Sequence, residues 1–448
     1  MMMTLRYWSA VAFALAAAIP TGATARDAVD GQWIVATDRW GNREYSTLNL
    51  RCAGDAISGD WDGEAVRGTM RGRHLHLEIR DQRAATYVFD GTLADDALRG
   101  EADYPDPNVA GARARHGFTA RHVPGRPAGG PRTIDFMPTD FANSFSADRA
   151  PVLTIWPGDT VRTQTIDSGG VDAQGVTRAL FGNPQVGPFF IAGAAPGDTI
   201  VVHILRLRLN RDWADSLDTM LGRALGTSLV PQAGDLGKPV RWHLDRAKGL
   251  AWPEHAGGGL GDYRVPVRPM LGGLALASGF GTAPMSTGDT GRSGGNMDFP
   301  EVIEGNSVYL PVQQPGGLLY LGDAHARQGD GETSQYALET SMDVTFRVDL
   351  IKGRSIPMPR VESPTELMAL GQGGSLDEAL KIASTGLIRW LQQDYGLTLS
   401  QVAQLMGAEA RFTIPNLAGR SVGVAARIDK ARLPARQSAL PSGEPAGD

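Results

Sequence analysis

Residues 322–332 read GDAHARQGDGE, a short run in which small residues separate polar side chains. Five of these side chains could bind a metal ion or move a proton: Asp323, His325, Gln328, Asp330 and Glu332. If the run begins at the end of a strand, Asp323 and His325 project from one face, because side chains alternate along a strand. Asp330 and Glu332 share a face if their segment is also extended. Asp298 and Glu339 could join them from the flanking segments.

Clustered carboxylates repel one another, so something positive must compensate them. A divalent cation would do this: carboxylates with a histidine suit Zn²⁺, whereas an oxygen-only subset suits Ca²⁺ or Mg²⁺. Such an ion lowers the pKa of water and polarises a carbonyl, and a carboxylate outside its ligand set could act as general base. The alternative is an acidic, glycine-rich surface loop, since no standard zinc motif such as H-E-x-x-H is present.

The composition narrows the class of protein. The 448 residues suggest two or three domains, and 57 glycines with 28 prolines favour turns and short strands. The net charge is −6 and there is no run of lysines and arginines, which argues against a nucleic-acid partner. The single cysteine, Cys52, excludes an intrachain disulfide. Because Cys52 lies far from the polar run, a cysteine-dependent amidase or protease is not expected.

The N-terminus has the pattern of a secretory signal peptide. Arg6 precedes an apolar stretch, residues 8–20, that is short for a membrane span, and Ala-Thr-Ala at 23–25 fits a cleavage site. We expect cleavage between Ala25 and Arg26 and a periplasmic or secreted protein without an integral membrane segment. An uncleaved anchor helix is the alternative.

The mature chain divides into regions of different character. Residues 26–122 contain eight short, mostly alternating segments separated by turn residues, which predicts an all-β meander or small up-and-down barrel. Residues 123–133 are rich in proline and glycine and read as a linker. Residues 134–433 form a second, β-rich unit, and residues 434–448 are expected to be disordered. Pro-Gly-Asp-Thr recurs at 157–160, after Trp156, and at 196–199, which predicts turns that use Asp159 and Asp198 to bond their own backbone.

Two helices are predicted near the C-terminus. Residues 375–396 carry Ala379, Leu380, Ile382, Ala383, Leu387 and Leu391 at helical spacing. Ser375 with Glu378 forms a capping box, and Gly396 follows the end of the helix. Thr398 with Gln401 starts a second helix in the same way. Without basic residues on that second helix, packing against the β core is favoured over DNA binding.

A serine nucleophile is a weaker possibility. Residues 291–295 read GRSGG and match G-x-S-x-G around Ser293. A nucleophile elbow needs a strand before the serine and a helix after it, but a Pro/Ser/Thr/Gly loop precedes this one.

Several segments together resemble the acetamidase/formamidase family. They are NPQVGPFFIAGAAPGDTIVVHIL (183–205), PVRPMLGGLALA (266–277), GGNMDFPEVIEGNSVYLPV (294–312), GDAHARQGDGE (322–332), ALETSMDVTFRVDLIKG (337–353) and the helical segment that begins PRVESPTELMALG (359–371). The resemblance covers about 134–433. It implies a mainly β hydrolase fold with peripheral helices, usually a homo-oligomer, that hydrolyses short aliphatic amides such as formamide or acetamide to carboxylate and ammonia.

The resemblance also implies a divalent metal, zinc first and calcium second, and a set of site residues. On this basis we predict Asp298, His325, Asp323 and Glu339 as metal ligands, with Asp330 as a competing candidate for the last ligand. Glu332 is the predicted general base, and His325 and Asp330 are predicted to take part in catalysis. Asn296 and Gln328 are predicted to contact the substrate.

The sequence departs from the family in two places. Members often carry a histidine just before the first strand of this module, whereas the matching residues here, TDFANSFSADRAPVLTI (139–155), contain none. The signal peptide and the added N-terminal β unit are also unexpected. A binding protein that has lost catalysis, or a hydrolase of lactams and other cyclic amides, therefore remain alternatives.

Overall fold

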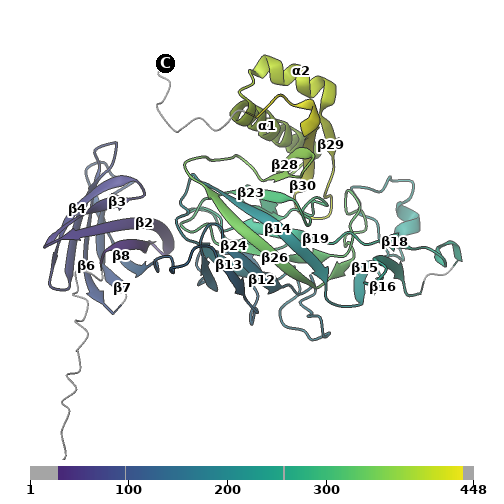
Figure 1. The fold of residues 1–448 in the computed structure, drawn as a ribbon, viewed down its shortest axis with the longest axis horizontal. Coiled ribbons are helices and arrows are strands. Elements are labelled where there is room, and N and C mark those ends of the chain that lie inside the picture. Colours follow the sequence, from purple (N-terminus) through teal and green to yellow (C-terminus); the bar gives the residue numbers. More distant parts are fainter. Residues whose placement is uncertain (1–28, 96, 256–257, 437–448) are drawn as a thin grey trace, which may run out of the picture. The chain divides into compact units, whose positions relative to one another are not determined.

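The computed structural model describes residues 29–95, 97–255 and 258–436 (Figure 1). The predicted signal peptide, residues 1–25, lies outside this range, as does most of the tail predicted to be disordered. Among the described residues, no helix is both long enough and apolar enough to cross a membrane. The chain divides into two compact units.

The predicted N-terminal β unit is confirmed as a closed, eight-stranded antiparallel barrel. Its neighbouring strands are joined mostly by tight turns; in one of them Asp62 and Gly63 have positive φ angles of 50° and 93°, as a two-residue hairpin turn requires. Trp33, Leu75, Leu77 and Phe89 are buried inside the barrel. The strands are β1 (Gly31–Arg39), β2 (Asn42–Ala53), β3 (Ala56–Trp61), β4 (Glu64–Arg71), β5 (His74–Arg80), β6 (Thr86–Ala94), β7 (Ala97–Pro105) and β8 (Arg113–His122).

The second unit contains two large sheets. In the first, the path β18-β17-β16-β15-β25-β24-β19-β22-β21 is extended by β13, which pairs with β24, and by β11, which pairs with β13. Their bounds are β11 (Leu153–Ile155), β13 (Gln185–Ile191), β15 (Trp213–Leu217), β16 (Pro239–Asp245), β17 (Leu250–Pro253), β18 (Val265–Pro266), β19 (Met270–Leu276), β21 (Thr290–Gly291), β22 (Gly294–Asn296), β24 (Leu319–His325) and β25 (Glu339–Thr340).

The second sheet has the order β29-β30-β28-β27-β23-β14-β26-β12-β9. Its strands are β9 (Thr133–Asp135), β12 (Thr160–Gln164), β14 (Thr199–Leu209), β23 (Ser307–Pro311), β26 (Met342–Ile351), β27 (Arg360–Glu362), β28 (Glu366–Gly373), β29 (Arg411–Thr413) and β30 (Val422–Asp429). A two-stranded ribbon pairs β10 (Ser144–Phe145) with β20 (Met285–Ser286).

One hydrophobic core joins the two sheets. It takes Leu274 and Leu321 from the first sheet and Ile200 from the second. The rings of Phe189 in β13 and Phe346 in β26 meet edge to face, 5.4 Å apart between centroids, which places one face of each sheet against the other. Strands β13, β19 and β24 are buried at every position, including the polar residues that β13 and β24 carry. The mainly β class predicted for this unit is confirmed.

Both predicted helices are present, at one end of this unit (Figure 1). Helix α1 (Leu376–Tyr395) begins where the Ser375 hydroxyl accepts from the Glu378 N–H and ends at Gly396, which has a φ of 63°. Helix α2 (Leu399–Glu409) carries the full capping box of Thr398 and Gln401. Helix α1 packs on β28 and β30 and buries Leu387 and Trp390 there, as was expected of a helix packed on the β core.

One detail of the helix prediction is wrong. Leu380 belongs to the predicted apolar stripe, yet it is 39% exposed, whereas Leu387 is fully buried. The stripe that faces β28 runs instead through Ala379, Ala383, Leu387 and Leu391, with Trp390 beside it. Gly371 in β28 explains how closely the helix approaches: a Cβ there would lie 2.0 Å from the Ala379 carbonyl oxygen.

The two Pro-Gly-Asp-Thr turns use their aspartates as predicted. The Asp159 carboxylate accepts from the Trp156 N–H, and the Asp198 carboxylate accepts from the Ala195 N–H. Gly158 and Gly197 have φ angles of 90° and 94°, which a type II turn demands at that position. These aspartates are therefore turn residues and do not join the polar run of 322–332.

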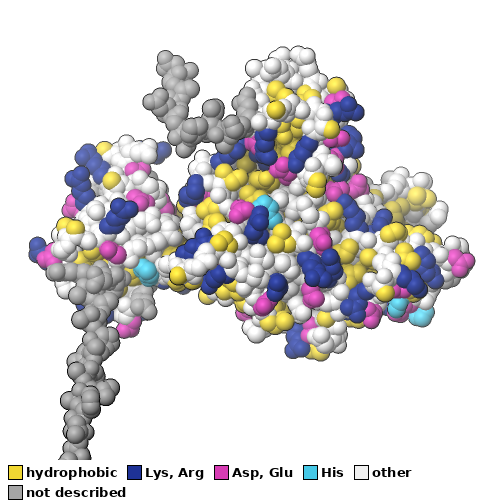
Figure 2. Space-filling model, viewed as in Figure 1, with side chains coloured by type: hydrophobic (Ala, Val, Ile, Leu, Met, Phe, Trp, Pro, Cys, Tyr) yellow, Lys and Arg dark blue, Asp and Glu magenta, His cyan; other side chains and the backbone are white. Residues whose placement is uncertain are grey.

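The surface drawn in Figure 2 carries charges of both signs. Lysine and arginine side chains are interspersed with aspartate and glutamate over the face in view. No extended area of one sign appears on that face, in keeping with the modest net charge of −6.

Replacing Leu387 by alanine should destabilise the α1 layer. The side chain is fully buried, so its loss removes apolar contacts and leaves a cavity, at a cost of about 2–5 kcal/mol in the free energy of unfolding. Leu380→Ala, on the same helix but partly exposed, is the matched control and should cost about 0.5 kcal/mol or less. Denaturant titrations of both variants would measure this. Equal costs would contradict the packing described here.

Candidate active site

The polar run of 322–332 begins on β24, a central strand of the first sheet, and continues into the loop that follows. Asp323 and His325 alternate on β24, so both side chains project from the same face, as predicted. Glu339 begins β25 directly opposite His325 in the strand register. A residue paired across antiparallel strands is held close to its partner, and His325 Nε2 lies 3.2 Å from Glu339 Oε1. The same nitrogen lies 3.4 Å from Asp323 Oδ1.

Two further carboxylates complete a buried cluster. Asp298 follows β22, and Glu332 lies in the loop between β24 and β25. Potential ligand atoms of Asp298, Asp323 and His325 lie within 4.8 Å of one another, and so do those of His325, Glu332 and Glu339. All five residues are at most 6% exposed. His325 belongs to both groups and stands at the centre.

Glycine makes the space in which this cluster forms. A Cβ at Gly272, in the neighbouring strand β19, would lie 2.4 Å from Asp323 Oδ2 and 2.6 Å from Asp298 Oδ1. No other residue type fits there without displacing the carboxylates. Asp298, Asp323 and Glu332 also have positive φ angles of 42°, 52° and 44°. Non-glycine residues rarely adopt this conformation, and such strain tends to occur at functional sites.

Burial and mutual repulsion set the ionisation of the carboxylates. Burial raises the pKa of Asp298 well above its usual range, and Asp323 raises it further. Burial also raises the pKa of Glu332 well above its usual range, and the charge of Asp298 adds to the rise. The pKa of Glu339 is lowered, because His325, Ser168 and the Ala337 N–H outweigh the effect of burial. Burial alone would lower the pKa of His325, but Glu339 and Asp323 raise it well above its usual range. One imidazolium cannot neutralise four carboxylates, so protons or a cation must do so.

Hydrogen bonds orient the imidazole. The Gln328 amide nitrogen donates to the Asp298 carbonyl oxygen at 2.6 Å and to the Pro415 carbonyl oxygen at 3.1 Å. The Gln328 amide oxygen therefore accepts from His325 Nδ1, at 2.9 Å. With a cation bound, a neutral imidazole held in this way would carry its proton on Nδ1 and leave the lone pair of Nε2 free to bind the ion. That arrangement is typical of histidines that bind metals.

The donor atoms of the cluster fit a divalent cation. Within the cluster, five buried side-chain atoms have no hydrogen-bond partner among the described residues: His325 Nε2, Asp298 Oδ1, both carboxylate oxygens of Asp323, and Glu339 Oε2. Buried polar atoms are rarely left unpaired, and these converge on one another. One imidazole nitrogen with carboxylate oxygens is a ligand set that zinc accepts, and the oxygens alone would suit calcium.

Comparison with known proteins indicates the family of this chain. Residues 277–370 match the model of the Acetamidase/Formamidase family. The crystal structure of an acetamidase from Yersinia enterocolitica shares 30% identity, covers 68% of this chain and 94% of its own, and superposes with a TM-score of 0.59. The chain belongs to the acetamidase/formamidase family. The N-terminal barrel lies outside the part that matches solved structures.

Other relatives match more narrowly. An acetamidase of Mycolicibacterium smegmatis is 40% identical over 63 residues, 14% of this chain, and a formamidase of Methylophilus methylotrophus is 43% identical over 60 residues, 13% of this chain. These alignments span only 16% and 15% of the length of the two relatives. A recombinant predicted acetamidase/formamidase from Thermoanaerobacter tengcongensis shares the fold, with a TM-score of 0.57, 24% identity, and coverage of 67% of this chain and 96% of its own.

The structure brings together most of the predicted family residues but leaves Asp330 outside. Residues 326–338 form turns and no strand, so the alternation expected for Asp330 and Glu332 does not apply. Asp330 is exposed. Partial burial raises its pKa and Glu301 adds to the rise, whereas Arg427 and Arg268 lower it. Its carboxylate belongs to neither group of potential ligands.

Asn296 and Gln328, predicted to contact substrate, form hydrogen bonds to members of the cluster. The Asn296 amide donates to Asp298 Oδ2 at 2.8 Å and accepts from the Asn183 amide at 2.9 Å.

The stretch 139–155, which lacks the histidine common in the family, pairs with β13 through the backbone of Ala142 and Gln185. Ser293 is buried between two short strands and accepts from Gln313, so it does not form a nucleophile elbow.

Three residues near the cluster were missed by the sequence analysis. Asn416 donates to Asp298 Oδ2 at 2.7 Å. Arg211 forms a buried ion pair with Asp167 at 2.7 Å and donates to the Glu339 carbonyl oxygen at 3.1 Å. Asn416 is 118 residues from Asp298 and Arg211 is 128 residues from Glu339 in the chain, and a single polar residue in so distant a segment gives no local signal.

A pocket of about 400 Å³ adjoins the cluster. Gln328 and Glu332 are among its lining residues, and Trp242, Tyr263 and Tyr336 contribute aromatic rings. Burial raises the pKa of Tyr336, and Glu339 and Glu332 raise it further, so this tyrosine lies close to both carboxylates. The pocket is large enough for a small organic molecule.

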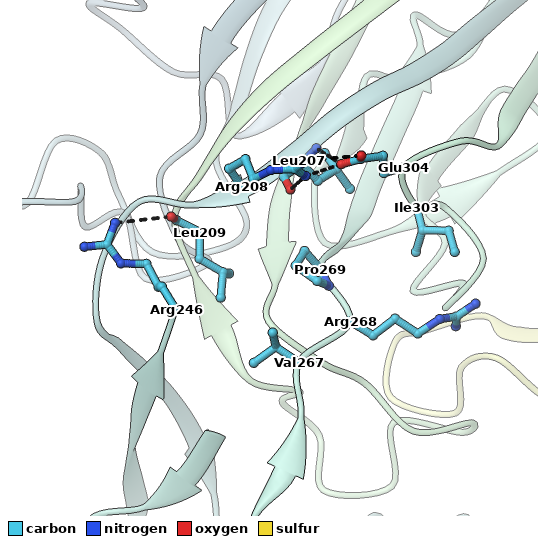
Figure 3. Close-up of a pocket in the computed structure, with 9 residues that line it drawn as sticks. All are labelled: Leu207, Arg208, Leu209, Arg246, Val267, Arg268, Pro269, Ile303 and Glu304. Atoms are coloured by element: carbon cyan, nitrogen blue, oxygen red, sulfur yellow. Dashed lines mark hydrogen bonds and ion pairs between the residues drawn. The ribbon is translucent and has the colours of Figure 1, made fainter. Parts of the chain in front are cut away.

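A second pocket, of about 370 Å³, lies between β14 and the segment before β19 (Figure 3). It contains none of the cluster residues. Its three arginines all pair with carboxylates: Arg208 with Glu304, Arg246 with Asp212 and Arg268 with Glu301. It therefore offers little free charge, and the chemistry of the chain is better placed in the buried cluster.

Gly272→Ala should disrupt the cluster. The new methyl group would overlap the Asp323 and Asp298 carboxylates, and overpacking of this kind costs about 1–3 kcal/mol. Gly329→Ala is the matched control, because a Cβ at Gly329 meets no atom within 4 Å. Denaturant titration and analysis of the bound metal should show lower stability and less metal for Gly272→Ala only. Metal content equal to that of the wild type would contradict the space requirement.

Proposed function

We propose that this protein is a metal-dependent amidohydrolase that converts a short aliphatic amide, such as formamide or acetamide, to carboxylate and ammonia. The observation that carries the proposal is the set of unpaired, buried and convergent donor atoms around His325. Membership of the acetamidase/formamidase family supports the same reaction class. The pocket beside Glu332 offers room for the substrate.

Asp298, Asp323, His325 and Glu339 would hold the metal, with zinc as the first choice and calcium as the second. Such an ion supplies positive charge that polarises the amide carbonyl and lowers the pKa of water. His325 is held for this role by Gln328, which keeps the proton on Nδ1. Arg211 and Asp167 support the backbone behind Glu339.

Glu332 is the proposed general base. It lies beside the other carboxylates, and one of its oxygens accepts from the Ala337 N–H at 3.1 Å, which orients the side chain. Burial gives it a raised pKa, which strengthens it as a base and lets it later return a proton. It would take a proton from the attacking water and deliver it to the departing nitrogen. The C–N bond then breaks, and the products are a carboxylate and ammonia.

Export and assembly are proposed on other grounds. The pattern of residues 1–25 supports cleavage after Ala25 and a periplasmic or secreted location. A homo-oligomer is proposed from the family resemblance. The proposed partner of the site is a small-molecule amide, whatever the location and assembly of the protein.

Glu332→Gln should lower ammonia release from formamide, acetamide or propionamide by about 10²–10⁴-fold, because a general base is lost without a change of shape. Glu254→Gln is the matched control: it makes the same change at an exposed glutamate that belongs neither to the cluster nor to the pocket beside it, and it should retain most of the activity. Activity should also disappear on chelation and return with zinc.

Two results would overturn parts of this proposal. Equal loss in Glu254→Gln and Glu332→Gln would remove the role given to Glu332. Metal binding without ammonia release from any linear amide would favour a binding protein, unless a γ-lactam added to the panel were opened.

A further inference from the structure

A short segment near the C-terminus reaches into the active site. Residues 414–421 connect β29 to β30, in the sheet that carries the helices. Within it, Asn416 is fully buried and its amide nitrogen lies 2.7 Å from Asp298 Oδ2. The partners are 118 residues apart in the chain. The segment therefore links the helical layer to the cluster.

The segment is hydrogen-bonded in both directions to the loop between β24 and β25. The Gly331 N–H donates to the Pro415 carbonyl oxygen at 3.1 Å, and the Leu417 N–H donates to the Gly331 carbonyl oxygen at 3.0 Å. The Gln328 amide donates to the same Pro415 oxygen. Residues 415–417 thus hold the loop that carries Glu332, while Asn416 holds Asp298.

Asn416 is itself fixed in one orientation. Its side-chain oxygen accepts from the Ala418 N–H at 2.6 Å, so its nitrogen must face Asp298. Asn296 donates to the same carboxylate oxygen from the other side, at 2.8 Å. With two donors on Oδ2, the second oxygen, Oδ1, has no partner among the described residues and lies with the ligand atoms of Asp323 and His325.

We propose that Asn416 is a positioning residue that holds Asp298 so that Oδ1 is the oxygen presented to the metal. A carboxylate that could rotate freely would populate several orientations. Hydrogen bonds from neighbouring residues to a metal ligand fix its orientation and so change the metal affinity. This inference rests on the metal site of the proposed function. Arg223 anchors the far side of the segment, donating to the carbonyl oxygens of Leu417, Gly419 and Arg420.

The test is calorimetric titration of metal-free protein with Zn²⁺. Asn416→Ala should bind Zn²⁺ about 10–100-fold more weakly than the wild type. Asn306→Ala is the matched control: Asn306 is also buried, at 5% exposed, and also donates one hydrogen bond, to the Glu301 carbonyl oxygen, but it lies outside the cluster. Its Zn²⁺ affinity should stay close to that of the wild type, even if its stability falls.

If the alanine variant does not fold, the Zn²⁺ affinity of Asn416→Leu is measured instead, because leucine keeps the side-chain size but has no hydrogen-bond donor. Wild-type affinity in a folded Asn416 variant, or equal weakening in Asn306→Ala, would overturn the inference while leaving the metal site in place. A wild-type protein that binds no divalent metal would overturn the metal site and this inference with it.

Discussion

The burial of four carboxylates around one imidazole is the constraint on which the rest of this structure depends. Asp298, Asp323, Glu332 and Glu339 are almost completely removed from water, where ionised groups are costly without compensation. His325 compensates only part of that charge. The remaining negative charge raises the pKa values of Asp298 and Glu332, in addition to the effect of burial. The unpaired oxygens are the atoms to which a cation would bind and neutralise that charge. The fold keeps these groups together in spite of their repulsion.

The sheet supplies the rigidity that this requires. Asp323 and His325 extend from β24, which is buried along its whole length between β19 and β25, so their backbone cannot yield easily. Gly272 leaves the volume that the carboxylates fill, and three of them occur at positive φ. Outside them stands a layer of amides: Gln328 on the histidine, and Asn296 and Asn416 on Asp298. In each amide the second polar atom is also hydrogen-bonded, so these amides fix the orientation of His325 and Asp298 from outside the cluster.

The sequence correctly predicted features that depend on residues close together in the chain, such as strand alternation and helix caps. Alternation along a strand placed Asp323 and His325 on one face, and capping residues located both ends of α1. The condition under which Asp330 and Glu332 would share a face is not met, because residues 326–338 form turns and no strand. The helical spacing also assigned Leu380 to the buried stripe, since a helical period by itself does not say which of two adjacent apolar residues faces the sheet. Asn416 and Arg211 could not be found, because nothing near them in the chain reveals their partners.

The sequence by itself determined the kind of chain this is: a mainly β protein with an eight-stranded N-terminal unit, two capped helices, and a polar run whose residue types suit a metal. These properties follow from composition, periodicity and local hydrogen bonding. Only the tertiary structure decided which carboxylates share one buried site, which oxygen of Asp298 is free, and that a C-terminal segment completes the site. Those outcomes depend on strand register and on contacts between residues far apart in the chain, which no local pattern encodes.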